Sequence, residues 1–577
     1  MKVILVYKPD EPIKGIQQNI IPNGLLYISA FLLKNGIDSE VLNLYRQGVD
    51  VILDRFPNIV GISCFTFNRH ACLELARQLK EKQKDIKIVF GGPHSTIMYR
   101  QLLDLDFIDA IVLGEGEETF LELVKACKKG DPLDNVKGIA YKRQGRIIDN
   151  GPREPVQDLD TLPFPAQFFK YKRLMTSRGC PGKCIFCDSP VLWGCKVRLR
   201  SAKNVVDEIE LLQKKYGLNS FIISDDTFTF SKERTIEICK EIIKRGLKIT
   251  WDCRSRVNYI CEERLRWMKR AGCSIISYGV ESGSPKILQG LKKGFNLDQV
   301  KQAARITRNC GIALNFYLIV GSPGETDDTI RETMTLIEET KPTSIFTFIM
   351  QLTPGTELYE RSKSKGIITD DIWQENKSGS IFYTKEKTLP ELARYLRLMN
   401  ELHRVLRKHF DFTQDFIQKL EELNSNDYVN LAQLAFNGDN NVDCDKFLAH
   451  AFDLNPFSSV AWMIKGVLLA KKNDPACIDC FNQSIKSDYE NILCYKNLFL
   501  YLQKQKRHVD AIDIARQAIC IEPADHELYK SLAYSLKKTQ DFPAAIEALK
   551  HCLVICPGDQ EAINDLRALQ LTTPSSL

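Results

Sequence analysis

The 577-residue sequence has no apolar run long enough to cross a membrane, and its first apolar segment, residues 1–7, is too short for a secretory signal. It also lacks a strong charge of either sign, because 79 basic and 73 acidic residues leave a net charge of +6. We therefore expect no membrane span and no nucleic-acid partner. Without an export signal, the 19 cysteines favour a reducing, cytoplasmic location, where they serve as buried thiols or metal ligands.

Length and composition indicate a globular α/β chain of several domains. Apolar residues make up 44% and charged residues 26%, and 577 residues exceed what one hydrophobic core organises. The patterns below predict a doubly wound (Rossmann-like) domain with a trailing hairpin, a linker, a barrel core, a helical connector and a helical repeat domain. Their expected bounds are residues 1–150, 151–168, 169–365, 366–415 and 416–577.

Three closely spaced cysteines, Cys180, Cys184 and Cys187, follow the pattern C-x3-C-x2-C. A cubic [4Fe–4S] cluster has four irons, so three thiolates would leave one iron open to bind and activate a small molecule. The alternative is a structural zinc site, for which Cys195 is the obvious fourth ligand. Zinc ligands usually come as separated C-x2-C pairs, so the single triplet favours the cluster.

Residues 1–128 alternate apolar segments with amphipathic ones, which predicts a parallel sheet covered by helices on both faces. The expected helices cover residues 24–34, 69–82, 96–103 and 117–128. Ligands bind at the carboxyl ends of such strands, where glycines let a large flat ligand approach the backbone. The candidate ligand-binding residues at these ends are Ser63, Gly91, Gly92, Pro93, His94, Gly114, Glu115 and Gly116.

From residue 173 to about residue 356, strand and helix patterns alternate about six times, which predicts a full or partial (β/α) barrel. The expected strands cover residues 174–177, 221–224, 249–253, 275–279, 314–320 and 345–351. In such barrels the chemistry lies at the carboxyl ends of the strands. Glycines, acidic residues and the cysteine loop all fall at these ends.

The segment that holds the cysteines, with Phe186 between the last two, resembles the signature of the radical S-adenosylmethionine (radical SAM) family. In that family the open iron chelates the amino and carboxylate groups of S-adenosylmethionine. The segments that begin at Asp225, at Gly279 and at Gly321 are similar to family segments around that molecule. The resemblance implies that the cofactor-binding residues are Phe186, Asp225, Glu281, Ser282, Gly321 and Pro323.

The resemblance implies a contact of Glu281 and Ser282 with the polar parts of S-adenosylmethionine, and an adenine slot shaped by Gly321 and Pro323. A local role is the alternative: Glu281 could pair with Arg254 or Arg256, and the glycines could form turns. Two further arginines, Arg198 and Arg200, follow the cysteine loop. They could neutralise the cluster or a carboxylate, or could be solvated charges.

Upstream of such a core, the N-terminal domain resembles the cobalamin-binding domain of cobalamin-dependent radical SAM enzymes, with residues 91–94 and 114–117 as the matching segments. The D-x-H-x-x-G segment, whose histidine ligates cobalt in many cobalamin proteins, is absent. Neither His70 nor His94 stands in that context, so cobalamin would be held without a histidine ligand. The alternative is a domain with an empty pocket.

Beyond residue 416 the chain repeats. Residues 476–485, 510–519 and 544–553 align at steps of 34 residues, as do Pro523 and Pro557. This period is typical of tetratricopeptide repeats, which stack helical hairpins and bind protein segments. We expect a protein partner here, and we expect the paired cysteines of these helices to be packing residues.

The resemblance implies an enzyme that uses the cluster to form a 5′-deoxyadenosyl radical, most simply a cobalamin-dependent methyltransferase acting on an unactivated carbon or phosphorus centre. A cobalamin-independent cyclisation, oxidation or rearrangement is the alternative within enzymes. A cluster-bearing interaction scaffold is the alternative outside them. We expect a small-molecule or peptide substrate and a reductant such as flavodoxin or ferredoxin. The sequence identifies no catalytic side chain.

Overall fold

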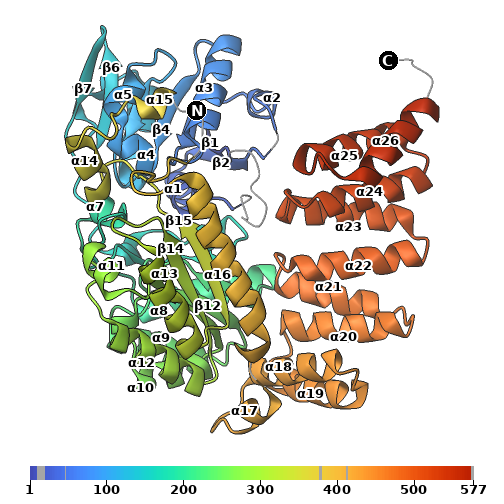
Figure 1. Cartoon of the computed structure of the whole chain (residues 1–577). Helices are drawn as coiled ribbons and strands as arrows, with labels where there is room; N and C mark the ends of the chain where they lie inside the picture. The colour runs from blue at the N-terminus through green and yellow to red at the C-terminus, as the bar shows by residue number, and fades with distance from the viewer. Residues whose placement is uncertain (10–19, 46, 376–379, 411–412, 573–577) are drawn as a thin grey trace. The chain divides into compact units, whose positions relative to one another are not determined.

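The structure is a computed structural model that describes residues 1–9, 20–45, 47–375, 380–410 and 413–572. The chain forms two compact units, one made mainly of residues 21–216 and 221–426 and the other mainly of residues 427–577 (Figure 1). Parts of the predicted connector, residues 376–379 and 411–412, lie outside the described residues. Within the described part of the chain, no helix is both long and apolar enough to cross a membrane.

The first unit begins with a seven-stranded sheet in the spatial order 2-1-3-4-5-6-7. Strands 1 to 5 are parallel, and a hairpin adds two antiparallel strands at one edge. The strands are β1 (Lys2–Tyr7), β2 (Asp38–Asn43), β3 (Ile59–Ser63), β4 (Lys87–Gly91), β5 (Ala110–Val112), β6 (Ile139–Arg143) and β7 (Arg146–Asp149). The helices are α1 (Asn23–Lys34), α2 (Asp50–Leu53), α3 (Arg69–Lys82), α4 (Pro93–Ile97), α5 (Tyr99–Leu103) and α6 (Glu117–Lys129).

Alternate residues of β1 pack into two separate cores. Ile4 and Val6 join the core on the α3 side, whereas Val3 and Leu5 join the core beneath α1 and α6. A strand buried on both faces is apolar at every position, which is why β1 reads as a continuous apolar run. The order reverses at β1, between β2 and β3, and ligands of such sheets bind at the carboxyl ends of the strands beside this reversal.

The single helix predicted over residues 96–103 is wrong. The backbone of Met98, with φ −103° and ψ 23°, leaves the helical conformation and separates α4 from α5. Both short helices pack beside β5. The predicted linker is also more ordered than its prolines suggested, because Leu159, Leu162 and Ala166 are buried.

The second large sheet of this unit, the core sheet, is an open sheet of six strands in the order 15-14-13-12-11-8, and its paired strands run parallel. Two edge strands remain, so the barrel is partial. The strands are β8 (Arg173–Leu174), β11 (Ser220–Ile223), β12 (Thr250–Ser255), β13 (Cys273–Glu281), β14 (Ala313–Val320) and β15 (Ser344–Ile349). A separate antiparallel pair joins β9 (Ser177–Arg178) to β10 (Arg198–Leu199), so the first predicted strand is split in two.

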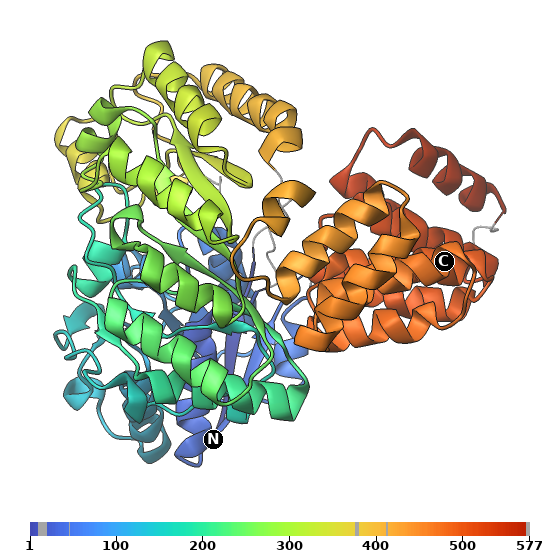
Figure 2. The ribbon, with the colours of Figure 1, turned by 90° about the horizontal axis from the view of Figure 1, so that it is seen from below.

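Helices cover the outer side of the core sheet, as the green ribbons of Figure 2 show. They are α8 (Ala202–Tyr216), α9 (Lys232–Lys244), α10 (Glu262–Arg270), α11 (Pro285–Gly290), α12 (Leu297–Asn309) and α13 (Asp327–Thr340). Further helices are α7 (Ser189–Trp193), α14 (Glu357–Ser364), α15 (Ile372–Glu375), α16 (Leu389–Phe410) and α17 (Gln414–Gln418). The outer-face residues Phe316, Leu318 and Val320 of β14 are buried in this layer.

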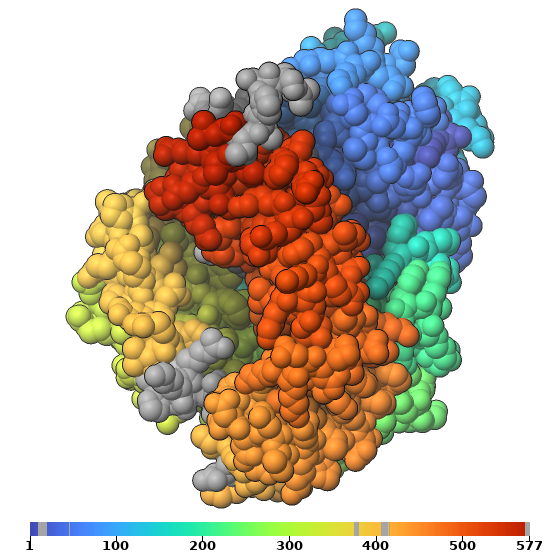
Figure 3. All heavy atoms as spheres, turned by 90° about the vertical axis from the view of Figure 1, so that its right-hand side faces the viewer, coloured from blue at the N-terminus to red at the C-terminus, as the bar shows by residue number. Residues whose placement is uncertain are grey.

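The second unit is a stack of helices, and its atoms run from orange to red in Figure 3. The helices are α18 (Ser425–Asn437), α19 (Asn441–Leu454), α20 (Ser459–Lys471), α21 (Cys477–Ser487), α22 (Ile492–Lys504), α23 (His508–Ile521), α24 (His526–Lys538), α25 (Phe542–Ile555) and α26 (Gln560–Thr572). Helices α20, α22, α24 and α26 begin 33, 34 and 34 residues apart, which matches the predicted repeat. Cys477 and Cys552 are fully buried in the shared core, as expected of packing residues.

Candidate cluster and cofactor sites

The loop after β9, at the carboxyl end of the core sheet, carries Cys180, Cys184 and Cys187. Antiparallel pairing of β9 with β10 closes this loop at its base. Gly179 enters the loop with φ +96°, and a Cβ there would lie 2.0 Å from the carbonyl oxygen of Lys196. Only glycine fits at this point, so the glycine in front of the first cysteine shapes the loop.

Hydrogen-bond donors surround the cysteine sulfurs. The Thr227 hydroxyl lies 3.4 Å from Cys180 Sγ, and the Gly182 N–H donates to the same sulfur at 3.4 Å. Arg256 is buried and donates through Nη1 to Cys184 Sγ at 3.5 Å. A Cβ on Gly182 would lie 2.7 Å from that Nη1, so the glycine makes room for the arginine. Such donors favour the thiolate form that iron requires.

The positions of the thiols argue against zinc. A tetrahedral zinc with Zn–S bonds of about 2.3 Å brings its sulfurs to within about 4 Å of one another. The Cys195 thiol donates to the Gly182 carbonyl at 3.5 Å, and no three of the four described thiols lie within 4.8 Å of one another. A cube with an iron at four corners holds its thiolates farther apart, so thiols that are not crowded together suit a cluster better than a single zinc ion. Burial raises the pKa of the free Cys187 thiol to about 12, so binding iron would release its proton.

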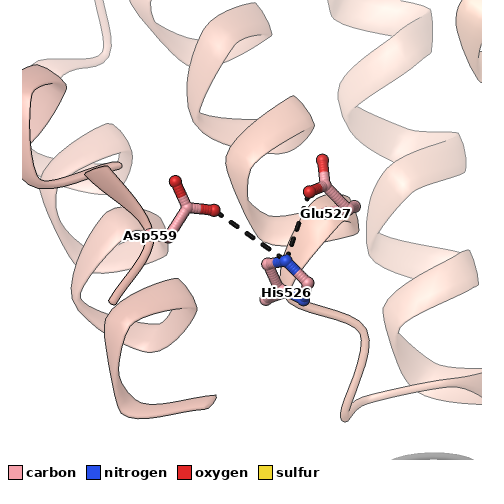
Figure 4. Close-up of side chains that lie close together, drawn as sticks. All are labelled: His526, Glu527 and Asp559. Carbon is pink, nitrogen blue, oxygen red and sulfur yellow. Dashed lines mark ion pairs between the residues drawn. The ribbon is translucent and has the colours of Figure 1, made fainter. Parts of the chain in front are cut away.

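One group of three ligand atoms within 4.8 Å of one another does occur among the described residues, in the helical stack. It consists of His526, Glu527 and Asp559 (Figure 4). Lys530 Nζ lies 3.1 Å from Glu527 Oε1 and 3.2 Å from Asp559 Oδ2. Because the lysine ammonium already lies within hydrogen-bonding distance of both carboxylates, we assign no metal there.

Asp225 is buried, and its carboxylate accepts four hydrogen bonds. Oδ1 accepts the N–H groups of Thr176 at 2.6 Å and Ser177 at 3.1 Å, and Oδ2 accepts their hydroxyls at 2.5 and 2.6 Å. These contacts fix the segment that leads into the cluster loop. A contact of Asp225 with S-adenosylmethionine stays a prediction, and the geometry favours the structural role.

Glu281 ends β13 in a left-handed conformation with φ +71°, which is uncommon for a residue other than glycine. The backbone pairing with β14 shifts between Gly279 and Glu281, so a bulge re-aims the side chain. Glu281 Oε1 accepts a hydrogen bond from Lys293 Nζ at 2.9 Å, and both side chains are buried. The alternative pairing of Glu281 with Arg254 or Arg256 is therefore wrong. Strain of this kind is typical of functional sites.

Lys293 is a site residue that the sequence did not reveal. Its Nζ lies 5.8 Å from the ring centre of Phe186 and 5.4 Å from that of Phe295. Its carbonyl oxygen accepts a hydrogen bond from Nη2 of Arg256, the arginine whose other nitrogen reaches Cys184. Arg256 and Lys293 thus connect the cluster loop to Glu281. No spacing rule marks them, because their partners lie in distant segments of the chain, the cluster loop and the end of β13.

The remaining predicted S-adenosylmethionine contacts have local partners. The Ser282 hydroxyl lies 3.3 Å from Thr333 Oγ1 and accepts the Ser284 N–H at 3.1 Å. Gly321 has φ +85°, and its N–H donates to Glu325 Oε2 at 2.6 Å. The buried hydroxyl of Ser322, between Gly321 and Pro323, has no partner among the described residues. A buried hydroxyl without a partner fits a ligand at this turn, while the roles of Ser282, Gly321 and Pro323 stay predictions.

A cavity of about 200 Å³ opens at the carboxyl ends of the N-terminal strands. Six of the eight predicted ligand-binding residues line it: Ser63, Gly91, Gly92, Gly114, Glu115 and Gly116. A Cβ on Gly61 would lie 2.7 Å from Leu5 Cδ2, and one on Gly116 would lie 2.6 Å from Ile28 Cδ1, so small residues keep the cavity open. Its volume admits a planar heterocycle and is smaller than a whole corrinoid, so cobalamin would enter it with one end.

Pro93 and His94 lie beside this cavity without lining it. His94 is buried, its Nδ1 lies 3.2 Å from Thr66 Oγ1, and its ring packs edge-on against Trp373. Burial, with the charge of Arg69, lowers the pKa of His94 to about 3. A neutral, packed ring agrees with a structural role, and cofactor contacts of these two residues stay predictions.

The cavity wall includes three residues of the core, Met175, Arg178 and Trp193. Arg178 pairs with Glu115 at 2.8 Å and with Glu117 at 2.5 Å, and all three side chains are at most 9% exposed. Burial opposes the charge of Arg178, but Glu117 and Glu115 raise its pKa above the usual value. Arg198 pairs with Glu115 at 2.6 Å, and Arg200 with Glu208 at 2.6 Å, so both arginines have protein carboxylates as partners.

Comparison with known proteins shows which family this arrangement of sites belongs to. Residues 174–337 match the profile of the radical SAM superfamily, and residues 14–124 match that of the B12 binding domain. An uncharacterized methyltransferase of Pyrococcus horikoshii is 32% identical over 417 residues, which cover 69% of this chain and 91% of the relative. The chain belongs to the radical SAM superfamily. This radical SAM protein carries its three-cysteine loop, and all the residues that line its cofactor cavity except Leu5, within the matched residues.

Two further likenesses extend the comparison. A cytidylyl-2-hydroxyethylphosphonate methyltransferase of Streptomyces wedmorensis is 27% identical over 422 residues, covering 60% of this chain and 78% of the relative. The solved structure of OxsB, a cobalamin-dependent S-adenosylmethionine radical enzyme with aqua-cobalamin and S-adenosylmethionine bound, matches with a TM-score of 0.52 at 17% identity. It covers 99% of this chain and 84% of that one, which confirms the predicted fold class.

The predicted cofactors of this radical SAM enzyme are confirmed at the level of the family: a [4Fe–4S] cluster, S-adenosylmethionine and cobalamin. The residues described above fit them. Three thiols with sulfur-directed donors suit the cluster, and a glycine-lined cavity suits one end of cobalamin.

Proposed function

We propose that this protein is a cobalamin-dependent radical SAM methyltransferase acting on an unactivated carbon or phosphorus centre. The observation that carries the proposal is the ionic contact of Arg178 with Glu115 and Glu117, which joins the cofactor cavity to the strand that enters the cluster loop. An enzyme that combines radical chemistry with methyl transfer needs both cofactors beside one substrate. The names of the two relatives above, both methyltransferases, support the same activity.

When bound, the cluster with S-adenosylmethionine supplies a carbon-centred radical, and methylcobalamin supplies a methyl group. The role of the chain's own residues is to bind and orient these cofactors. Cys180, Cys184 and Cys187 would hold iron, and Arg256 donates a hydrogen bond to the sulfur of Cys184. Glu281, held by Lys293, presents a carboxylate at the end of β13 for the polar parts of S-adenosylmethionine.

The test uses anaerobically reconstituted full-length protein. After incubation with methylcobalamin and removal of unbound cofactor, corrinoid bands should remain in the visible spectrum above the cluster absorbance. Under strong reduction the protein should cleave S-adenosylmethionine to 5′-deoxyadenosine, and Cys184→Ala should abolish cleavage. Retained cluster absorbance without corrinoid bands would refute cobalamin dependence and favour a cyclisation, oxidation or rearrangement. Full cleavage by Cys184→Ala would refute the cluster assignment.

We further infer a small-molecule substrate, a flavodoxin or ferredoxin as electron donor, and a protein partner for the helical repeats. The repeat spacing of α20 to α26 supports the last of these, because such stacks bind protein segments. None of the 19 cysteines forms a disulfide bond in the described structure, which supports a reducing, cytoplasmic location.

A further inference from the structure

The strand register defines which side chains of the core face the inside of the partial barrel. In a parallel sheet, paired residues point to the same side. Ser277 pairs with Asn315, and Gly279 with Tyr317, on the side opposite to the buried Phe316 and Leu318. These residues therefore belong to the inner face, which no helix of the outer layer covers.

An aromatic group occupies the upper part of this inner face. Tyr317 pairs with Phe346 on β15, and the register continues to Phe348. The ring centre of Tyr317 lies 5.6 Å from that of Phe346 and 6.0 Å from that of Phe348. Phe346 is 44% exposed and Phe348 is 47% exposed. Adjacent exposed aromatic rings on a sheet face are typical of a binding surface.

An arginine without an ion pair lies one row deeper on the same face. Arg254 pairs in register with Ser277 and so shares a row with Ser277 and Asn315, whose side chains approach to 3.4 Å. Arg254 is exposed, and it makes no ion pair within the described parts of the chain. Asp226 follows β11 and interacts with Arg254 at longer range, while its own Oδ2 accepts the Ser189 hydroxyl at 2.7 Å. The guanidinium fork is therefore available to a carboxylate.

The strand register gives the positions of the aromatic rings and of Arg254 relative to the predicted S-adenosylmethionine site. Tyr317 shares its row with Gly279, just before the bulge that aims Glu281. The row of Arg254 lies two residues deeper, or about 6.6 Å along the strands, and β12, which carries Arg254, lies two strands or about 10 Å across the sheet from β14, which carries Tyr317. A ligand that spans both rows would therefore have its ring next to the S-adenosylmethionine site and its anionic group farther inside.

We propose that this inner face binds the substrate, a flat aromatic molecule with a carboxylate. The ring packs against Tyr317, Phe346 and Phe348, and the carboxylate pairs with Arg254. This substrate class rests on the proposed function, since the ring then lies beside the site of radical formation. The carboxylate of S-adenosylmethionine is the other source of an anion for Arg254, and the experiment separates the two.

The experiment measures binding of 2-naphthoate and of uncharged 2-naphthamide to cluster-reconstituted full-length protein by ligand-observed NMR. It is run with wild type, Arg254→Gln, Phe348→Ala and the control Arg305→Gln, which changes an exposed arginine on the outer helix α12. We expect wild type and Arg305→Gln to bind 2-naphthoate at least tenfold more tightly than 2-naphthamide. Arg254→Gln should lose this preference, and Phe348→Ala should lower the affinity for both ligands.

Three outcomes would overturn the inference: no 2-naphthoate binding by wild type, an unchanged preference in Arg254→Gln, or a loss of S-adenosylmethionine affinity alone in that variant. The last result would assign Arg254 to the cofactor. Cleavage of S-adenosylmethionine by the wild-type preparation is measured in parallel. Cleavage without naphthoate binding refutes the substrate class only, whereas naphthoate binding without cleavage refutes the proposed enzyme function only.

Discussion

Arg178 is the residue at which the cofactor cavity and the cluster loop depend on each other most directly. Replacing it by methionine keeps an unbranched apolar stem and removes the guanidinium charge that faces Glu115 and Glu117. Glu115 keeps Arg198 as a partner at 2.6 Å. Glu117 loses its only ion pair among the described residues while its side chain is 4% exposed.

The expected cost follows from that burial. Removing one partner of a buried ion pair destabilises a protein by about 3–5 kcal/mol, because the other charge stays buried without compensation. The double variant Arg178→Met/Glu117→Gln removes the uncompensated charge, so we expect it to be more stable than Arg178→Met alone. The coupling between the two sites should reach about 2 kcal/mol.

Denaturant unfolding of the apoprotein, followed by circular dichroism, measures these differences in the transition that includes the first unit. Arg331→Met is the matched control, because Arg331 pairs with Asp328 at the surface, where the side chains are 70% and 81% exposed. This control should cost less than about 1 kcal/mol. An equally small cost for Arg178→Met, or additive effects of Arg178→Met and Glu117→Gln, would refute the claim that the buried network holds the two sites together.

Three further predictions concern the cofactors and pH. Gly61→Ala should lower hydroxocobalamin affinity at least tenfold in a titration followed by visible absorbance, while S-adenosylmethionine cleavage persists. The reason is that the new Cβ would lie 2.7 Å from Leu5 Cδ2 and would push that side chain into the cavity. An affinity equal to that of wild type would contradict the cavity assignment. Lys293→Met should weaken S-adenosylmethionine binding measured by calorimetry, since it removes the 2.9 Å contact that holds Glu281, and unchanged binding would argue against a role for Glu281. Burial raises the pKa of Glu325 to about 7. The contribution of Glu325 to the free energy of unfolding should therefore be complete below about pH 4.5 and lost as pH rises through 7, by at most about 3 kcal/mol. Glu325→Gln should remove this part of the pH dependence of unfolding. A pH profile identical to that of wild type would refute this role of Glu325.

The sequence was sufficient for features that local rules determine. The spacing of the three cysteines predicted the cluster loop, and alternating apolar segments predicted both sheets. Glycines at strand ends predicted most of the cavity. The 34-residue step predicted the helical stack, because each repeat buries the same positions against its neighbours.

Features that depend on tertiary pairing were not accessible. The local alternative for Glu281 was a nearby arginine, but the bulge in β13 turns it toward Lys293. Glu115 was expected to contact cofactor, and it also pairs with Arg178 and Arg198 from the core. Met98 ends a helix whose apolar period continues, because the packing of α4 and α5 beside β5 outweighs local propensity.

The shared wall of the cofactor cavity limits how freely such domains can be exchanged between proteins. A B12-binding domain moved onto another barrel would bring Glu115 and Glu117 without Arg178, and it would lack the side of the cavity that Met175 and Trp193 supply. The two carboxylates would then be desolvated without a cation. A functional chimera would have to carry the β9 segment and α7 along with the N-terminal domain. The segments that must be exchanged together for this site therefore come from both domains.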